Sequence, residues 1–393
     1  MPSETRSAVP SLRTILEQWG RIGLIGFGGP PAHINLLREL CVADRRWMSS
    51  EQFEHAVAAT NMMPGPASTQ LAIYCAWRLR GTAGAIVGGL GFICPGLAAI
   101  IALSALFLAG SPPDWLRAAA MGSGAAVAAV AARAGTDLAT PIWTAARSSR
   151  RVRVAAYGLA GSISAATLGA WLVLVLLGCG AIELAVERGV RPTGAAALWP
   201  LGGLRIPLAA SVADPGGTAA LAWTALKVGG LAFGGGFVIV PLMQADAVST
   251  YHWMTHSQFL NAVALGQITP GPVTQTVAAV GYAAGGLPDA LLAAAVAFAP
   301  SFSFILAGGA RFEALLANPG VRAFLAGAAP AAAGAIIGSA VPLASAISES
   351  WQYALLALAA VSLLVLRRGV FITLLASGCA GALAGILGAP IVR

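Results

Sequence analysis

Long apolar runs restrict the fold of this chain more than any other feature of its sequence. Residues 82–110 and 167–186 are almost uninterrupted apolar stretches. Each is long enough to cross a bilayer as a helix, which takes about 20 apolar residues. Only 10% of the 393 residues are charged, whereas about a quarter are charged in a soluble domain. The sequence therefore predicts an all-α polytopic membrane protein.

The basic charge of the chain is explained by its membrane orientation. The formal net charge is +8, and the arginines gather at segment ends, as in RSSRRVR at 147–153. Cytoplasmic loops of membrane proteins carry such an excess. We therefore expect a lipid bilayer around the protein and no nucleic acid partner. The five cysteines lack metal or redox spacing, so no metal site and no cofactor are expected.

An internal repeat of 206 residues divides the chain into two halves. Phe27-Gly28-Gly29 corresponds to Phe233-Gly234-Gly235, and Pro64-Gly65-Pro66 corresponds to Pro270-Gly271-Pro272. Over 27–66, 15 of 40 positions are identical, and the halves align without a gap. Duplicated halves are typical of transporters, whose substrate sites lie at the repeat interface. We expect a first repeat at 1–187, a linker at 188–217 and a second repeat at 218–393.

The distribution of arginine predicts that the two repeats are inverted. Arg38, Arg45 and Arg46 lie between the two motifs of the first half, whereas the matching stretch 237–269 has no Lys or Arg. The positive-inside rule then places this region in the cytoplasm in the first half and outside in the second.

The remaining cations fit the same scheme. The gap-free register aligns Arg78 and Arg80 with uncharged Ala284 and Gly286. The linker must then cross the membrane once. Four further segments are expected to cross once each, near 287–310, 321–347, 350–366 and 369–389.

The glycine- and proline-rich motifs predict broken, re-entrant helices. From Arg13 to Phe27 a helix rises about 20 Å, so the break at 28–31 lies deep in the membrane. Residues 50–62 are expected to re-enter, break at Pro64-Gly65-Pro66, and leave again over 67–79. Irregular backbone at this depth is tolerated only inside protein or around a wet cavity.

These breaks predict an anion site. A helix that starts after proline leaves N–H groups free, and its positive dipole end attracts anions. A simple proline kink is the alternative, but two symmetric pairs of breaks favour the site. Glycines, prolines and hydroxyl side chains form the predicted binding set: Gly28, Gly29, Pro64, Gly65, Pro66, Ser68, Thr69, Gly234, Gly235, Pro270, Gly271, Pro272, Thr274 and Thr276.

Two cations extend this set. Lys227 is the single lysine, and it aligns with Arg21, each six residues before its Phe-Gly-Gly motif. An intramembrane cation indicates a functional site, and snorkelling to the interface is the alternative. His33 and Asp246 are the residues that could carry a coupled proton, although a satisfied polar residue is the other interpretation of each. No nucleophile constellation or nucleotide loop is present, so the chain is not expected to be an enzyme.

Four motifs in order resemble the two-domain chromate ion transporter (CHR) family: GLIGFGGPPAHI (23–34), ATNMMPGPASTQLAIY (59–74), LKVGGLAFGGGFVIVPLM (226–243) and ALGQITPGPV (264–273). The resemblance implies a multi-pass protein of the bacterial inner (plasma) membrane that exports chromate by the proton-motive force and confers chromate resistance. Its homologous halves would have opposite orientations. Some relatives have a carboxylate where this chain has Gln70, which puts proton coupling through that position in doubt.

Several functions stay open at this stage. Sulfate has the charge and shape of chromate, so a carrier of sulfate or a related oxyanion is the first alternative. A membrane phosphatase is the second, but it would need acidic and arginine residues beside the Ser of PGPASTQ, which the motif lacks. A homodimer is also open.

Overall fold

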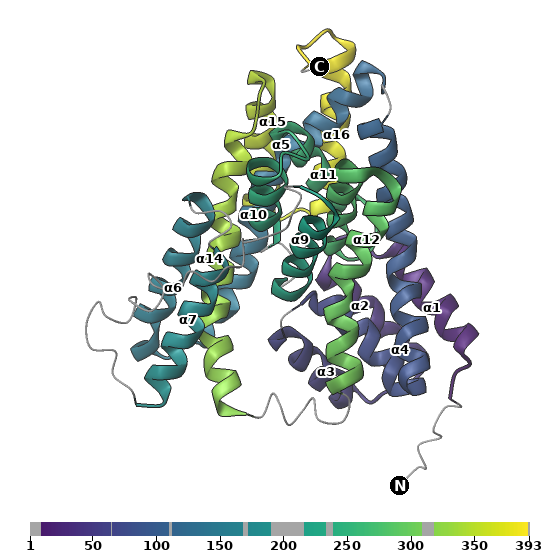
Figure 1. Cartoon of the computed structure of the whole chain (residues 1–393), viewed down its shortest axis with the longest axis vertical. Helices are drawn as coiled ribbons and strands as arrows, with labels where there is room; N and C mark the ends of the chain where they lie inside the picture. Colours follow the sequence, from purple (N-terminus) through teal and green to yellow (C-terminus); the bar gives the residue numbers. More distant parts are fainter. Residues whose placement is uncertain are drawn as a thin grey trace.

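The computed structural model describes residues 9–63, 65–109, 112–167, 172–189, 216–232, 239–308 and 318–391. Every regular element within these ranges is a helix, and four helices are long and apolar enough to cross a membrane. They are Ala67–Leu108, Asp114–Ala145, Val273–Gly308 and Pro319–Ser345. The predicted all-α polytopic membrane fold is confirmed (Figure 1).

The helices of the first half are α1 (Leu12–Ile25), α2 (Pro30–Arg38), η1 (Glu39–Asp44), α3 (Ser50–Met62), α4 (Ala67–Ser104), η2 (Ala105–Ala109), α5 (Asp114–Ala145), α6 (Ser148–Thr167) and α7 (Leu172–Glu187). Those of the second half are α9 (Thr218–Leu231), α10 (Ile239–Gln244), η5 (Ala245–Thr250), α11 (His256–Ile268), η6 (Val273–Gln275), α12 (Thr276–Gly308), α14 (Pro319–Ser345), α15 (Ser350–Ala360), η8 (Val361–Val365) and α16 (Val370–Ile386).

The helix breaks predicted in the first half are present. Helix α3 ends at Met62 and α4 begins at Ala67, so the Pro-Gly-Pro motif lies between two helical pieces. The first piece of α4 then ends at a non-helical bend at Arg80 and Gly81. The remainder of α4, residues 82–104, is a long apolar helix. Helices α1 and α2 are likewise separated by a break, in which Gly28 and Gly29 adopt positive φ.

The second half repeats these local structures. Ser49 and Gln52 form a capping box at the start of α3, and Thr255 and Gln258 form one at the start of α11. Each box satisfies backbone N–H groups that a helix start leaves without intrahelical partners. The residues at the two matching turns, Arg46 and His252, both adopt positive φ, at 50° and 54°.

The gap-free register of the halves is wrong beyond the Pro-Gly-Pro motif. The bend at Arg80 and Gly81 corresponds to the bend at Gly285 and Gly286, so the offset there is 205 and not 206. The second half starts this helix with the 3₁₀ turn η6. Three 3₁₀ residues rise about 6 Å, as four α-helical residues do. One residue fewer therefore reaches the same height.

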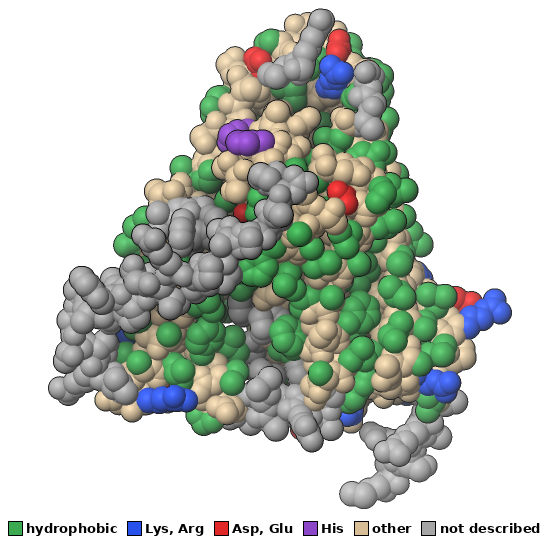
Figure 2. All heavy atoms as spheres, in the orientation of Figure 1, with side chains coloured by type: hydrophobic (Ala, Val, Ile, Leu, Met, Phe, Trp, Pro, Cys, Tyr) green, Lys and Arg blue, Asp and Glu red, His purple; other side chains and the backbone are tan. Residues whose placement is uncertain are grey.

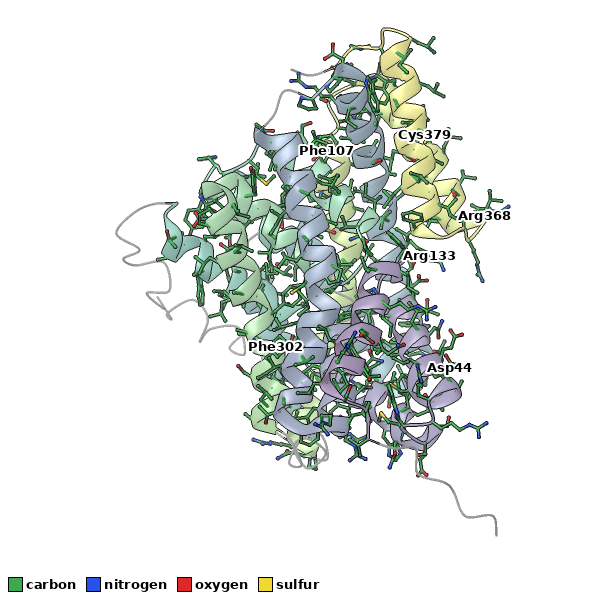
Figure 3. All side chains as sticks on the ribbon, turned by 90° about the vertical axis from the view of Figure 1, so that its right-hand side faces the viewer. Asp44, Phe107, Arg133, Phe302, Arg368 and Cys379 are labelled. Carbon is green, nitrogen blue, oxygen red and sulfur yellow. The ribbon has the colours of Figure 1, made fainter. Side chains whose placement is uncertain are left out.

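The long parts of α4 and α12 pack against each other. Gly89 of α4 lies against Phe302 of α12, and Gly96, about two turns further along α4, lies against Gln275 of η6. Phe302 is marked in Figure 3. The two short helices before the breaks cross these long helices at equivalent glycines, Gly23 on α4 and Gly229 on α12.

The terminal hairpins of the two halves are exchanged. In the first half, α6 and α7 pack along α14: Gly161 touches Ala331, and Cys179 touches Gly327. In the second half, α15 and α16 pack along α5. Gln352 donates to the carbonyl of Met121, and Ser123 donates to that of Leu374. Each half thus covers the long helix of the other (Figure 1).

Two of the segments that were expected to cross the membrane once each, 350–366 and 369–389, form short helices. Helix α16 has 17 residues, and α15 with η8 spans Ser350–Val365. Such helices are about 25 Å long, less than the hydrocarbon core of about 30 Å. They form an antiparallel pair along α5, with Arg368 at the turn between them (Figure 3). The linker predicted at 188–217 lies outside the described residues except at its ends.

The surface fits a bilayer. Hydrophobic side chains cover the flank over α4 and α12, and charged side chains lie mostly towards the ends of this face (Figure 2). Exposed apolar residues on these helices include Ile86, Leu90, Leu287 and Leu291. A lipid-facing surface of this kind is expected for a multi-pass membrane protein.

Candidate functional site

The break of the second half is bonded to the first half. The backbone N–H of Gly271 donates to the carbonyl oxygen of Gly26, at 3.1 Å. Gly26 ends α1, and Gly271 lies between the two prolines that separate α11 from η6. Breaks that are far apart in the sequence therefore meet at one place in the fold.

His33 closes the first-half side of this contact. Its Nε2 lies 2.9 Å from the same Gly26 carbonyl, and its Nδ1 lies 3.1 Å from the hydroxyl of Ser68. A carbonyl only accepts, so Nε2 carries the proton, and in the neutral ring Nδ1 accepts the proton of Ser68. The ring is fully buried and stands edge-on to Phe92. His33 thus links α2, the end of α1 and the start of α4.

Gln275 closes the second-half side. Its Nε2 donates to the carbonyl of Pro270 at 2.8 Å and to the hydroxyl of Thr269 at 3.0 Å. Its Oε1 is buried and accepts no hydrogen bond from the described residues. Gly96 of α4 packs directly on Pro270 and on this amide, so the central helix of one half forms a wall of the other half's break.

The four predicted hydroxyl residues divide into two kinds. The hydroxyl of Ser68 is occupied by His33, and that of Thr276 donates to the carbonyl of Val273 within its own helix at 2.7 Å. Thr69 and Thr274 are fully buried, and their hydroxyls have no partner among the residues that the structure describes. In the corrected register these two threonines are equivalent. A buried unsatisfied hydroxyl is rare and needs an explanation.

The helix starts around the breaks also lack side-chain caps. Helix α4 begins after Pro66 and η6 begins after Pro272, each with no side-chain hydrogen bond to its first turn. Helix α2 offers no free donor, because Pro30 and Pro31 have no N–H and the N–H groups of Ala32 and His33 donate to Gly29. The first N–H groups of α4 and η6 have no intrahelical acceptor. The geometry therefore brings free backbone donors and two free hydroxyls to one buried region.

The two predicted cations have different surroundings. Lys227 pairs with Asp246, at 2.5 Å, and the hydroxyl of Thr224 donates to the same carboxylate oxygen at 2.8 Å. The exposed fractions of the lysine and aspartate side chains are 13% and 4%. Asp246 aligns with Leu40 of the first half, so this ion pair has no counterpart there.

Arg21 is exposed and borders a cavity of about 90 Å³ that Gln18 and Glu39 also line. No interaction joins it to Lys227 among the described residues. The sequence repeat aligns Arg21 with Lys227, but the structure shows no interaction between these two cations in the described part of the chain. The structure instead pairs Lys227 with Asp246, a contact that the repeat does not predict.

Three predicted site residues, Pro64, Gly234 and Gly235, lie outside the described part of the chain. Gly28, Gly65 and Gly271 adopt the positive φ that the predicted turns require, at 102°, 118° and 97°. No group of three metal-ligating side chains occurs in the described ranges.

Gln275 was missed by the sequence analysis. A usable signal was present, because the dipeptide Thr-Gln follows each Pro-Gly-Pro motif, as Thr69-Gln70 and as Thr274-Gln275. The extra residue in PGPASTQ hid this match from an alignment without gaps. A β-carbon at Gly65 would overlap the Gln70 amide, as one at Gly271 would approach that of Gln275. The two glutamines therefore occupy equivalent places.

Comparison with known proteins identifies relatives over the whole chain. The chromate transporter family matches residues 13–184 and 219–385. The chain is 30% identical to the chromate transport protein of Cupriavidus metallidurans, over 98% of this chain and 94% of that protein. It is 31% identical to the chromate transport protein of Pseudomonas aeruginosa, over 88% and 85%. It is 25% identical to an uncharacterized transporter of Methanocaldococcus jannaschii, over 79% and 78%. No solved structure matches.

Proposed function

The chain belongs to the chromate transporter family, and on that premise we propose that it exports chromate from the cytoplasm across a bacterial inner membrane. The proton-motive force, chiefly its electrical part, would drive export, and the cell would thereby resist chromate. A family of transporters, and not of enzymes, also removes the membrane phosphatase from consideration.

The observation that carries this proposal is the meeting of the two breaks at Gly26 and Gly271. Around that bond lie uncapped helix starts and the unpartnered hydroxyls of Thr69 and Thr274. Neutral donors suit a tetrahedral dianion, because each oxyanion oxygen can accept several hydrogen bonds. Backbone and hydroxyl donors also release their ligand more readily than a buried cation would, which a transporter requires.

The membrane potential supplies the direction. A dianion that leaves an inside-negative cell is favoured by roughly 2 × 2.3 kcal/mol per 100 mV. Export therefore needs no nucleotide, consistent with the absence of a nucleotide loop from the sequence.

His33 and Asp246 are the proposed sites of proton exchange. A proton added to Nδ1 of His33 would reverse its bond with Ser68, because the imidazolium ring only donates. The Ser68 hydroxyl would then turn its own proton towards the anion. Asp246 is tied to Lys227, so any proton that it gains or loses changes the freedom of that lysine to act on an anion.

Flux into and out of proteoliposomes tests the function. We expect wild-type protein to move chromate at a rate that rises with an imposed voltage of the correct sign. Sulfate offered at the same concentration measures selectivity, because neutral donors distinguish two tetrahedral dianions weakly. Sulfate flux without chromate flux would identify sulfate, and not chromate, as the substrate. A flux that does not depend on the imposed voltage would contradict the proposed driving force.

Thr274→Val tests the site separately. It removes the buried hydroxyl and keeps the shape of the side chain. A hydrogen bond to a charged group contributes about 1.5–3 kcal/mol, so apparent chromate affinity should fall roughly 10- to 150-fold. Thr144→Val is the matched control, since Thr144 is exposed and bonds within its own helix. Equal affinity in both variants would move the site elsewhere without affecting the assignment of substrate.

A further inference from the structure

An apolar groove runs between α5, α6 and α14, away from the breaks. Its volume is about 500 Å³, and its walls include Ile142 and Trp143 of α5, Ala155 and Leu159 of α6, and Ile337 of α14. Along α6 it extends from Val154 to Ser162, about 12 Å at the rise of an α-helix. Leu159 and Trp143 are 62% and 45% exposed, so the groove opens to the outside of the protein.

The groove results from small residues at a helix crossing. Gly334 of α14 approaches the backbone of Gly158 so closely that a β-carbon there would overlap it. Helices in membranes associate through such small residues. Because the crossing is tight at its centre and α5 diverges beside it, a channel of side-chain size remains between the three helices.

Cations gather at one end of the groove. The guanidinium of Arg151, in the first turn of α6, lies over the ring of Trp143, 5.6 Å from its centroid, and Arg147 lies in the turn between α5 and α6. Buried Glu183 binds Arg150 and Arg153, at 2.7 and 2.9 Å. Arg147 and Arg151 are exposed and have no acidic partner among the described residues, so two positive charges remain uncompensated.

We propose that this groove holds an acyl chain of an anionic phospholipid whose phosphate is bound by Arg147 and Arg151. The charge is complementary, because the groove is apolar and two free guanidinium groups stand at its mouth. Arginine binds phosphate through paired donors. Tryptophan prefers the level of the lipid headgroups, which suits Trp143 near the end of α5. The lipid would fill the space beside the crossing and join α6 to α5.

A second copy of this chain fits the groove less well. A twofold contact through the groove would bring Arg147 and Arg151 of both copies together. Like charges at short distance oppose such a contact. An anionic lipid neutralises the same charges.

Native mass spectrometry of the full-length protein in detergent tests the proposal, with phosphatidylglycerol and phosphatidylcholine as the lipids added. We expect one phosphatidylglycerol to be retained in preference to phosphatidylcholine. Each arginine near an anionic lipid contributes a factor of about five. Arg147→Gln with Arg151→Gln should therefore weaken phosphatidylglycerol binding roughly 25-fold. The control is Arg45→Gln, because Arg45 also stacks on a tryptophan, Trp47, without bordering this groove.

A second pair of variants tests the groove itself. Ala155→Phe adds a ring inside the groove, and Ala156→Phe adds the same ring at the neighbouring exposed position that does not line it. Only Ala155→Phe should displace the lipid. Equal binding of both lipids, or equal binding by both phenylalanine variants, would overturn the proposal. So would a dimer that Ala155→Phe dissociates, since a second chain would then occupy the groove.

Discussion

Gly271 donates its backbone N–H to the carbonyl of Gly26, so the loop that breaks the second half is held by the residue that caps the end of α1. The same carbonyl lies 2.9 Å from Nε2 of His33. One oxygen atom of the first half therefore joins three segments: the end of α1, helix α2 and the second break. A substitution in any one of these three segments should therefore alter the position of the other two.

Gly271→Ala should impair transport more than folding. Position 271 has φ of 97°, where a β-carbon costs about 1–3 kcal/mol of strain. A loop that relaxes this strain loses the bond to Gly26, so we expect transport at least tenfold slower at normal abundance. Gly230→Ala is the control, because that glycine is helical with open space around it. Wild-type flux in Gly271→Ala would show that the bond is dispensable.

The ion pair of Lys227 and Asp246 should couple strongly in a double-mutant cycle. Lys227→Gln leaves a nearly buried carboxylate without its partner, which costs about 3–5 kcal/mol. Adding Asp246→Asn should restore most of the thermal stability, measured in detergent. Arg21→Gln should change stability by less than about 0.5 kcal/mol, because Arg21 is exposed.

Transport in the same variants separates function from structure. If Lys227 and Asp246 act on the anion or on a proton, the stable double variant transports poorly. Full transport by the double variant would reduce the pair to a structural role, and the anion site would rest on helix starts and hydroxyls alone.

The bond between His33 and Ser68 should make chromate affinity depend on pH. When pH falls, His33 gains a proton, Nδ1 becomes a donor, and the Ser68 hydroxyl is released towards the anion. Affinity should therefore rise at lower pH. Ser68→Ala should remove this rise while leaving some transport. The anion's own protonation affects wild type and variant alike, so identical pH profiles would exclude His33 as the switch.

Opposite orientation of the halves should appear in cysteine labelling of intact cells. Arg45→Cys is expected to be cytoplasmic and His252→Cys external, and both positions are exposed. The exposed native thiols, Cys94 and Cys379, are replaced by serine beforehand. An impermeant maleimide should label only position 252. Labelling of both positions from one side would contradict inversion of the repeats.

Local features of this fold could be predicted from the sequence. Proline removes a backbone donor and fixes φ, and glycine permits positive φ. The breaks before Pro30 and Ala67 were therefore predictable from the local residues alone, without knowledge of any tertiary contact. The capping residues Ser49 and Thr255 mark helix starts in the same way. Free donors at the start of α4 follow from helix geometry alone.

Relations between distant segments were not predictable. The gap-free register failed because a 3₁₀ turn reaches the height of an α-turn with fewer residues, and this hid the match of Gln70 with Gln275. The pairing of Lys227 with Asp246 joins residues on different helices. Arginine spacing and repeat symmetry carry no information about such contacts, which depend on how α9 packs beside η5.

The exchanged hairpins have a consequence for biogenesis. Helix α5 is synthesised before the helices that cover it, α15 and α16, which follow more than 200 residues later in the chain. Until then the hydroxyl of Ser123 lacks its acceptor at Leu374, and the backbone of Gly122 lacks the close neighbour Gly381. Packing around α5 is therefore incomplete until α15 and α16 have been synthesised and inserted.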